Sequence, residues 1–455
     1  MTPTTLDGFG GALLADGDDG YDDARTVFNS MIDRRPGLIA QCESVADVQA
    51  ALAHAQANGL EIAIRSGGHS VVGASSIDGG LVIDMRRMNT VEVDPDAKTA
   101  TVAGGATWSH FDTATQPHGL ATTGGRVSST GVAGLTLGGG SGWFEREWGF
   151  ACDNLLEVDV VAADGSVLTA NEDENSELFW ALHGGSGNFG IATRLVFRLH
   201  DLPASTFALL AWPSEVGPDL ARTYRDLMEA GAPTRLGGGV AYLTGPPEPF
   251  IPEHLHNERV IGLIAVFAGT EAELRDVLAP IYAMEPQGGL TAEMPYAEIQ
   301  CAIDDPPGFR NYWSASHLTS LPDEALELYC RQGEEMIVPS PSQHLLIPWG
   351  SGVAAQATDW PMTHRGATWV THPFGLWSDE GDDERGKAWT RRSVEELRPY
   401  DVGSTYLNFV ADAGDDDVRA SFGEGNYARL AAVKAEFDPN NIFNRHHPIK
   451  PLAPA

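Results

Sequence analysis

The segment from Thr122 to Trp143, TTGGRVSSTGVAGLTLGGGSGW, is the strongest constraint that this sequence places on its fold. No helix or regular strand needs so many glycines, whereas backbone that lies against a flat or phosphorylated ligand does. A low-complexity linker is the alternative interpretation. Val132, Leu135 and Leu137 place apolar side chains between the glycines, and this spacing favours a packed segment.

A second glycine pair ends an apolar run in IRSGGHS, residues 64–70. The preceding residues predict a strand, then an amphipathic helix with Val45 and Val48 on its apolar face and a stop at Gly59, then a second strand. This β-α-β order places His69 where the backbone would come closest to a ligand.

A third segment, HGGSGNFG, contains Gly185, Gly187 and Gly190 in the G-x-G-x-x-G spacing of dinucleotide-binding folds. That motif requires a strand before it and a helix after it. Here the helix-like NSELFWALHGG precedes the glycines and the strand-like IATRLVFRLH follows them. The order is inverted, so a Rossmann NAD site is not expected, although close backbone approach to a ligand still is.

The chain divides into four parts. A polar lead covers residues 1–35, and residues 36–205 combine the β-α-β unit with hairpins such as TVEVDPDAKTATVAGG, which indicates an α+β domain. Residues 206–400 alternate apolar runs with helices, one beginning at the Thr270-x-x-Glu273 capping box, and predict an antiparallel sheet covered by helices. Residues 401–455 return to the first domain.

The charge balance excludes some partners. Acidic residues number 63 against 29 basic ones, for a net charge of −34, and such a field repels nucleic acid and anionic membranes. Either a protein from a salt-adapted organism or an ordinary acidic bacterial protein would have this composition. No long apolar window and no signal-like start occur, so we expect a cytoplasmic location without membrane contact.

The cysteines carry no metal or disulfide pattern. Cys42, Cys152, Cys301 and Cys330 are far apart and lack C-x-x-C spacing, which makes a zinc cage or a disulfide framework improbable. Buried free thiols are the expected state.

Five motifs together resemble the flavoproteins of the vanillyl-alcohol oxidase class, and within it the berberine-bridge-enzyme-like oxidoreductases. They are RSGGHS, GVAGLTLGGGSGW, DNLLEVDVVAADG, LFWALHGGSGNFGI and NYARLAAVKAEFDPNNIF, and they span nearly the whole chain. The resemblance implies a two-part PCMH-type FAD-binding domain, with the antiparallel sheet of the substrate domain as a roof over the flavin.

The resemblance also implies how FAD is held. The backbone after the first β-α-β unit would wrap the pyrophosphate, and His69 would bond covalently to the 8α-methyl carbon of the flavin. A covalent substituent of this kind raises the reduction potential of the flavin and prevents loss of the cofactor. The alternative is a His69 that is not bonded to the flavin and only caps the turn. The positions implied at FAD are Arg65, Ser66, Gly67, Gly68, His69, Ser70, Thr130, Gly131, Leu135, Gly138, Gly139, Gly140, Cys152, Asn154, Gly187, Asn188, Gly190 and Asn408.

Many relatives carry a second flavin bond, from a cysteine. Alignment of the glycines places Val127 at that position, and Cys152 lies 25 residues further along, so a single covalent link is expected. The same alignment places Thr130 where the family controls oxygen access. Threonine is not bulky, which favours an oxidase.

The candidate catalytic residues are His372 and Tyr406. In WVTHPFGLW, strand alternation puts Val370, His372 and Phe374 on one face, and His372 matches the catalytic carboxylate of the berberine bridge enzyme. An edge histidine next to a strand-disturbing proline is the alternative. Tyr406 matches the tyrosine of a Y-x-N motif, but its deprotonation needs a cationic or donating neighbour.

Other residues are weaker candidates for the active site, because their positions on predicted elements also fit the core. Tyr427 falls on an amphipathic helix, and Tyr312 and Trp313 would line the pocket or fill the core. His446 and His447 replace the Asn and Gln of related sequences. Without a carboxylate or cysteine at ligand spacing, no metal site is expected.

The resulting hypothesis is an FAD-dependent oxidoreductase that removes hydride from a carbon bearing a hydroxyl or an amine of a small metabolite or sugar. A tyrosine or histidine base would assist, and molecular oxygen would be the acceptor. A flavin dehydrogenase with another acceptor is one alternative, and a catalytically silent flavin-fold binding protein is the other.

Overall fold

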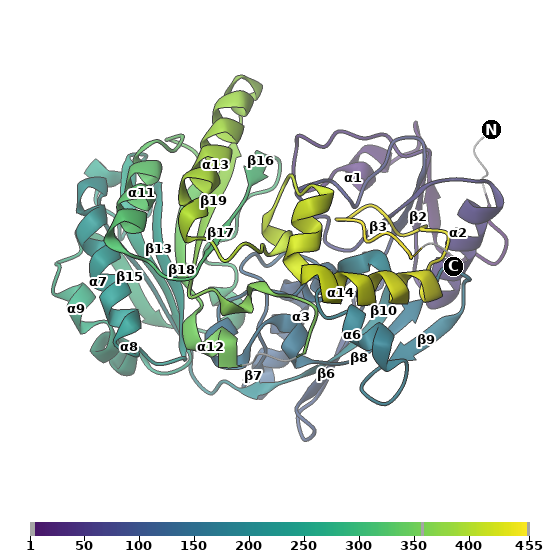
Figure 1. Cartoon of the computed structure of the whole chain (residues 1–455), viewed down its shortest axis with the longest axis horizontal. Coiled ribbons are helices and arrows are strands. Elements are labelled where there is room, and N and C mark those ends of the chain that lie inside the picture. Colours follow the sequence, from purple (N-terminus) through teal and green to yellow (C-terminus); the bar gives the residue numbers. More distant parts are fainter. Residues whose placement is uncertain (1–4, 356–358, 453–455) are drawn as a thin grey trace.

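The fold is taken from a computed structural model, which describes residues 5–355 and 359–452. Two smaller sheets lie on one side of the molecule and an eight-stranded sheet lies on the other, as Figure 1 shows. The C-terminal part of the chain runs back to the smaller sheets. The observed architecture is therefore the α+β arrangement that the sequence predicts.

The first sheet contains the predicted β-α-β unit. Its strands, in the order β1-β2-β4-β3, are β1 (Ala12–Leu14), β2 (Leu38–Gln41), β3 (Ile62–Arg65) and β4 (Leu81–Asp84). β2 and β3 both run parallel to β4. The helix α2 (Val45–Ala57) connects β2 to β3 along the chain. The predicted lead contributes β1, which pairs with β2, and α1 (Tyr21–Arg25).

The second sheet is antiparallel, in the order β5-β6-β10-β8-β9. Both predicted hairpins are present. The strands are β5 (Val91–Asp94), β6 (Thr99–Ala103), β8 (Leu155–Val161), β9 (Val167–Ala170) and β10 (Ile191–Arg198), and β7 (Leu120–Ala121) pairs separately with β11 (His200–Asp201). The associated helices are α3 (Trp108–Thr115), α4 (Val132–Leu137), α5 (Glu145–Trp148) and α6 (Ser176–Ala181). α4 shows that part of the glycine-dense segment is helical.

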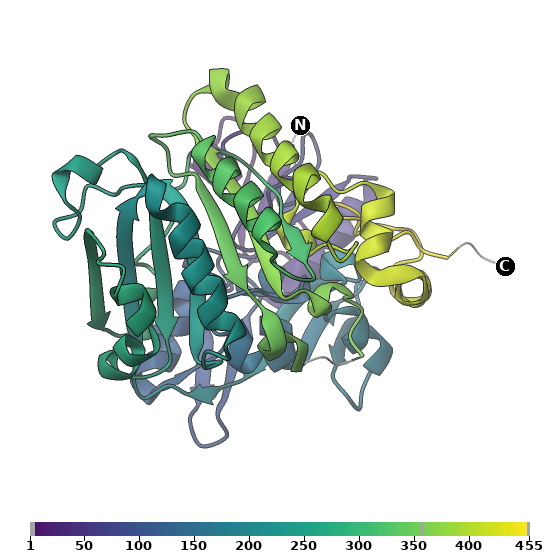
Figure 2. The same ribbon diagram turned by 60° about the vertical axis from the view of Figure 1, so that its left-hand side comes forward.

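The third sheet is antiparallel and has helices on one face (Figure 2). Its strands are β12 (Thr206–Pro213), β13 (Leu236–Thr244), β14 (Arg259–Phe267), β15 (Gly288–Glu293), β16 (Arg310–Trp313), β17 (Ser316–Leu318), β18 (Gln343–Pro348) and β19 (Trp369–Trp377). The helices are α7 (Gly217–Glu229), α8 (Glu271–Val277), α9 (Ala279–Tyr282), α10 (Tyr296–Ile299), α11 (Asp323–Glu334), α12 (Gly350–Ala355) and α13 (Asp383–Leu397). The predicted capping box is confirmed, because Thr270 and Glu273 exchange hydrogen bonds at the start of α8.

Strand alternation gives this sheet two apolar faces. On β12, Leu210 and Trp212 pack with the helices, whereas Phe207 and Leu209 pack with Trp143 of the glycine-dense segment. The sheet is therefore buried on both sides. Its inner face lies against the smaller sheets, as the expected roof would.

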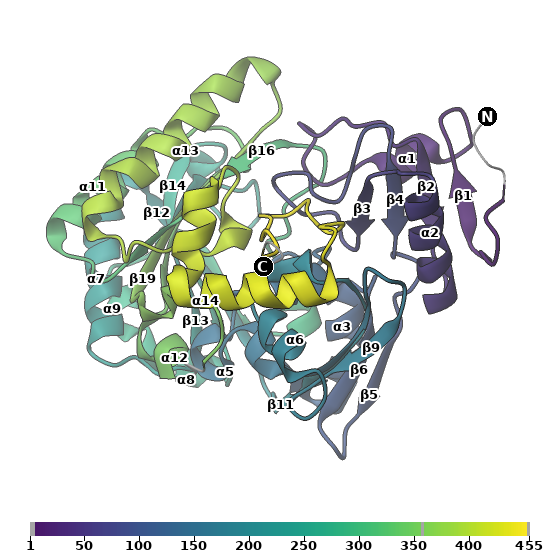
Figure 3. The same cartoon turned by 45° about the vertical axis from the view of Figure 1, so that its right-hand side comes forward.

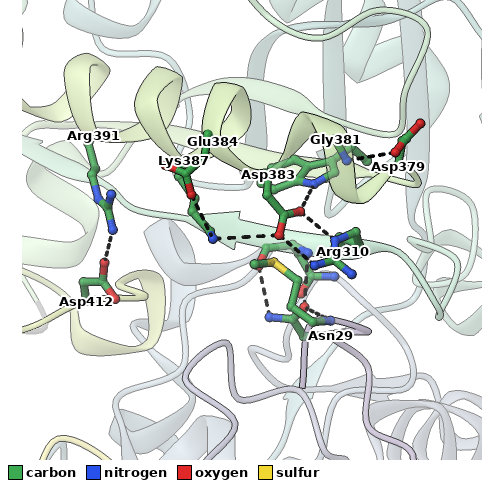
Figure 4. Close-up of polar contacts among 12 residues, drawn as sticks. Asn29, Arg310, Asp379, Gly381, Asp383, Glu384, Lys387, Arg391 and Asp412 are labelled. Carbon is green, nitrogen blue, oxygen red and sulfur yellow. Dashed lines mark hydrogen bonds and ion pairs between the residues drawn. The ribbon is translucent and has the colours of Figure 1, made fainter. Parts of the chain in front are cut away.

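The edge strand β16 is held from two directions (Figure 4). The Asn29 side chain, from the N-terminal segment, accepts a hydrogen bond from the Asn311 N–H at 3.1 Å and donates to the Asn311 carbonyl at 3.0 Å. On the other side, Arg310 makes two hydrogen bonds of 2.6 Å with Asp383 of α13. These contacts fix the position of Trp313, the last residue of β16.

The C-terminal helix α14 (Asp415–Phe437) lies along α6 and is broken at Gly423, which has φ +72° (Figure 3). Lys434 near its end is fully buried. The ammonium lies 2.6 Å from each of three oxygens, which belong to the Asp438 carboxylate and the Asn188 and Phe443 carbonyls. This buried pair ties the returning segment to the third glycine segment.

All four cysteines are free thiols, and Cys301 is exposed, so the expectation of burial is wrong for this one. Within residues 5–355 and 359–452, no helix is long and apolar enough to cross a bilayer. Over the same ranges, no group of three or more histidine, cysteine or acidic side chains is arranged to hold a metal ion.

Candidate functional site

A cavity of about 330 Å³ lies where the three glycine segments meet the inner face of the eight-stranded sheet. The predicted positions that line it are Ser66, Gly67, Gly68, His69, Ser70, Thr130, Gly131, Leu135, Gly187, Gly190, His372 and Asn408. The predicted positions outside its lining are Arg65, Gly138, Gly139, Gly140, Cys152, Asn154, Asn188 and Tyr406. The structure therefore separates the predicted set into a lining and a supporting layer.

The loop after β3 presents unpaired backbone donors to this cavity. Gly68 has φ +78°, a left-handed conformation that glycine adopts without strain. The N–H groups of residues 67–70 donate to no backbone or side-chain acceptor in the described part of the chain. All four residues line the cavity, and successive free backbone N–H groups are a common binding site for anions.

The first and second glycine segments touch at Gly67 and Gly131. A Cβ atom on Gly67 would lie 2.2 Å from the backbone nitrogen of Gly131, so neither position tolerates a side chain. Gly134 and Gly187 also line the cavity, but a Cβ atom there would meet no protein atom within 4 Å. The glycines therefore leave open space against bare backbone, which suits a flat ring and a pyrophosphate. These residues fit FAD.

His69 lies in this loop with its ring already oriented. Its Nε2 atom is 2.9 Å from the Ser129 hydroxyl, and its ring stacks on Phe28 with centroids 4.1 Å apart. Burial, assisted by the nearby Arg65 guanidinium, lowers the pKa of His69 to about 4. The imidazole is therefore neutral at ordinary pH and has a lone pair available for bonding.

Arg65 supports the loop from behind. Its guanidinium donates to the carbonyls of Ala24 and Thr26, and so attaches the N-terminal segment to the end of β3. Because Arg65 is buried without a carboxylate partner in its hydrogen bonds, burial lowers its pKa to about 10. Its role in the structure is to position the loop.

Asn188 organises the C-terminal segment. Its amide donates to the Gly185 carbonyl at 2.8 Å, and its oxygen accepts from the Ile449 N–H at 3.1 Å. The side chain is buried, and the backbone carbonyl of Asn188 accepts a hydrogen bond from Lys434. Asn188 thus links the third glycine segment to residues that follow α14.

Cys152 and Asn154 lie in the layer beneath the cavity. The Cys152 N–H donates to the Gly139 carbonyl at 2.9 Å, and burial raises the pKa of its thiol well above the ordinary value. A protonated thiol outside the cavity is not a nucleophile for a cofactor. Asn154 donates to the carbonyls of Trp148 and Phe150 at 3.0 Å each and therefore stabilises a turn.

Tyr406 is fully buried and its hydroxyl oxygen is an acceptor. It accepts from the N–H groups of Gly140 at 2.8 Å and Ser141 at 3.1 Å, and from the Asn408 amide at 2.9 Å. Burial nevertheless raises the pKa of Tyr406 to about 12, although these donors act in the opposite direction. The three donors hold Tyr406 to the turn at Gly139 and Gly140, outside the cavity lining.

His372 is the predicted catalytic residue that does line the cavity. β19 is paired with β18 on one side and with β16 and β17 on the other, so the edge interpretation is wrong. The registers of β16 and β17 place Ser314 opposite Pro373, which has no N–H to donate. His372 Nδ1 lies 2.7 Å from the Ser314 carbonyl and replaces that missing donor.

This contact fixes the state of the imidazole. A carbonyl only accepts, so Nδ1 carries the proton and Nε2 is left with a lone pair. The ring stacks on Phe409 with centroids 4.2 Å apart, and burial lowers the pKa of His372 to about 4. His372 is therefore a neutral proton acceptor within the cavity wall.

Several lining residues were not anticipated from the sequence. Asp305 lies between α10 and β16, in an irregular Asp-Asp-Pro-Pro stretch that carries no periodic signal. Gln343 and Leu345 alternate on β18 and share the inner face with His372, a pattern that the alternating apolar run would have revealed. Arg126 lines the cavity and pairs with the buried Glu145 at 2.7 Å.

The remaining candidates divide between cavity and core. Trp313 lines the cavity and stacks on Phe374, whereas Tyr312 donates to Asp412 outside it. Tyr427 is a buried residue of α14 and lies outside the lining. His446 lines the cavity and lies 3.1 Å from the Ser186 hydroxyl, and His447 packs behind it.

The fold and this site define the class of protein: a flavin-binding protein in which two smaller sheets form the FAD-binding domain and an antiparallel sheet covers the cavity. Residues 36–171 match the family described as "FAD binding domain", and residues 405–450 match the family described as "Berberine and berberine like". The FAD-linked oxidoreductase pgmH of Aspergillus terreus is 31% identical over 95% of this chain and 91% of its own length. The chain therefore belongs to the berberine-bridge-enzyme-like FAD-linked oxidoreductases, and it is an enzyme of that family.

Three further comparisons cover nearly the full length of the chain. The (R)-6-hydroxynicotine oxidase of Paenarthrobacter nicotinovorans is 28% identical over 99% of this chain and 98% of its own. The crystal structure of 6-hydroxy-D-nicotine oxidase from Arthrobacter nicotinovorans superimposes with a TM-score of 0.85 at 25% identity, and 99% of each chain is covered. A chitooligosaccharide oxidase shares the fold, with a TM-score of 0.81 at 22% identity.

Proposed function

We propose that this enzyme is an oxidase that removes hydride from a carbon bearing a hydroxyl or an amine of a small molecule, with oxygen as the acceptor. The observation that carries the proposal is the neutral His372 with a free Nε2 in the wall of the cavity that His69 also lines. The relatives named as a hydroxynicotine oxidase and as oligosaccharide oxidases support the reaction class.

When bound, FAD supplies a two-electron acceptor for the hydride that leaves the substrate carbon. The residues that would hold it are the backbone donors of the His69 loop and the bare glycines at 134 and 187. We propose that His69 attaches the flavin through one covalent bond. Val127 in the lining and the protonated Cys152 outside it support a single link.

His372 Nε2 is the proton acceptor in this proposal. As the C–H bond breaks and its electron pair leaves with the hydrogen, the O–H or N–H proton of the substrate passes to Nε2, and a C=O or C=N bond forms. The Ser314 carbonyl accepts from Nδ1–H and stabilises the imidazolium that results. Thr130 in the lining is small, which supports access for oxygen.

The cofactor is tested by denaturing the purified protein in acid and measuring intact mass and visible absorbance. We expect one flavin to remain attached to the wild type and none to His69→Ala, with Cys152→Ala as the control that keeps it. Flavin that survives in His69→Ala contradicts the proposed link. A protein that never contains flavin contradicts the reaction as well.

The acceptor is tested with a panel of amines and alcohols. We expect hydrogen peroxide to form in step with substrate oxidation in air. Rapid reduction of an electron-accepting dye together with poor oxygen turnover would instead identify a dehydrogenase.

A further inference from the structure

The loop between α10 and β16 contributes Ile303 and Asp305 to the cavity lining, and two neighbouring carboxylates attach it to its surroundings. Asp304 accepts from the Ser128 N–H at 2.7 Å and from the Ser128 hydroxyl, which attaches the loop to the glycine-dense segment. Asp305 points to the sheet instead, and its Oδ1 accepts from the Gln343 amide at 3.2 Å. Within residues 5–355 and 359–452, Asp305 makes no ion pair, and the side chain that it binds, Gln343, is neutral.

The strand register places Gln343, the hydrogen-bond partner of Asp305, near His372. Gln343 is paired with Phe374, and Leu345 is paired with His372 one step further along the same face. Positions two residues apart on a strand are separated by roughly 6–7 Å. The carboxylate and the proton acceptor therefore lie within the span of a small molecule.

An aromatic wall stands beside the carboxylate. Trp313 stacks on Phe374 with ring centroids 4.7 Å apart and an interplanar angle of 27°, and both line the cavity. The hydrogen bond from Asn29 to β16, and those from Arg310 of β16 to Asp383, hold this wall in place. Aromatic faces attract cations as well as apolar rings.

The charges at this end of the cavity do not balance. Arg126 is neutralised by Glu145 at 2.7 Å, and His372 is uncharged except in acid. Arg445, the other arginine named in the lining, donates to the Ser76 carbonyl, next to the first sheet. Asp305 is left as the uncompensated charge at the sheet.

Building on the proposed function, we propose that Asp305 is a specificity-determining residue that binds a protonated amine or amidine-like group of the substrate. The Trp313–Phe374 pair would hold the adjoining apolar or aromatic body, while the reacting carbon lies toward His372. The preferred substrates are therefore cations, and neutral molecules of the same shape bind less tightly.

The charge of Asp305 sets the pH range of this preference. Burial, with a contribution from the Asp304 carboxylate, raises the pKa of Asp305 to about 7, and the Gln343 amide opposes this shift. The other groups that share this end of the cavity are His372 and the Arg126–Glu145 pair. Cation binding is therefore expected to strengthen as pH rises through about 7 and to weaken in acid.

The test uses benzamidine and benzamide, which have nearly the same shape but differ by one positive charge. Neither has a hydrogen on the carbon next to nitrogen, so neither can be oxidised by hydride loss. Binding to the flavin-loaded enzyme is followed by perturbation of the flavin spectrum at about pH 8.5 and about pH 5.5. The variants are Asp305→Asn and, as a control with the same charge change, Asp276→Asn on the exposed face of α8.

At the higher pH, we expect benzamidine to bind at least about tenfold more tightly than benzamide, both in the wild type and in Asp276→Asn. In Asp305→Asn the two probes should bind equally, with flavin content unchanged. Equal binding in the wild type, no benzamidine binding, or a preference that survives in Asp305→Asn overturns the inference. Failure of the proposed function is distinguishable, because it appears as missing flavin or missing turnover.

Discussion

The Nδ1 atom of His372 lies 2.7 Å from the carbonyl oxygen of Ser314, the residue that faces Pro373 across the sheet. In an antiparallel pair this carbonyl would normally accept the N–H of the facing residue. Pro373 cannot donate, so the acceptor is free for the imidazole. Pro373, which was expected to disturb the strand, thus orients the proposed base.

Replacing Pro373 with alanine should release His372. The new N–H competes for the Ser314 carbonyl, so Nδ1–H loses its partner and the two tautomers of the ring become mixed. We expect kcat to fall about three- to tenfold at constant flavin content. Nitrogen NMR of labelled histidine would show the tautomer change directly, and Pro348→Ala on β18 is the matched control. An unchanged His372 signal would refute this role for Pro373.

His372→Asn should remove the proton acceptor but retain a donor for Ser314. We expect kcat/KM to fall by about 10²–10⁴, the usual contribution of a positioned base. Because the pKa of His372 is about 4, the wild-type rate should rise as pH increases through that value and then level off, since the neutral ring is the active form. The variant should lack this acid limb. Retention of full activity would exclude His372 as the base.

Tyr406→Phe distinguishes a structural tyrosine from a catalytic one. The change leaves the donors at Gly140, Ser141 and Asn408 without their acceptor, so the free energy of unfolding should fall by about 1–3 kcal/mol. Thermal unfolding measures this loss, and kcat should change less than tenfold. A loss of 10²–10⁴ in kcat with normal stability would instead assign the proton transfer to Tyr406.

Ser129→Ala tests how His69 is prepared for its bond to the flavin. The Ser129 hydroxyl holds Nε2 at 2.9 Å, so its removal should slow covalent attachment by about three- to tenfold while leaving FAD binding intact. The fraction of acid-stable flavin is followed over time after FAD is added to cofactor-free protein. Ser109→Ala, an exposed hydroxyl on α3, is the control. Equal rates in both variants would show that Ser129 does not position His69.

Local patterns predicted the elements that carry the cofactor site. The β-α-β unit, both hairpins and the capping box at Thr270 all follow from residues close together in the chain, and each is present. Strand alternation also placed His372 and Phe374 on one face correctly. These predictions succeed because the interactions that decide them lie within one or two elements.

The motifs suggested that all of their residues contact the cofactor, but in the structure some line the cavity and others lie beneath it. Arg65, Asn154 and Asn188 bind backbone carbonyls in the supporting layer, and a motif does not distinguish a residue that lines a cavity from one just beneath it. Asp305 was missed because its neighbours in the chain carry no pattern. Its position at the cavity depends on a hydrogen bond from Gln343, which lies 38 residues further along the chain.

The sequence by itself determined the β-α-β unit that leads to the His69 loop, and the glycines at 134 and 187 that leave bare backbone at the cavity. Glycine and proline act on their own peptide units, so their effects can be read without knowing the fold. Only the tertiary structure decided which side chains face the cavity and in which protonation state. That depends on burial and on partners such as Ser314 and Gln343, which strand pairing brings together across long separations in sequence.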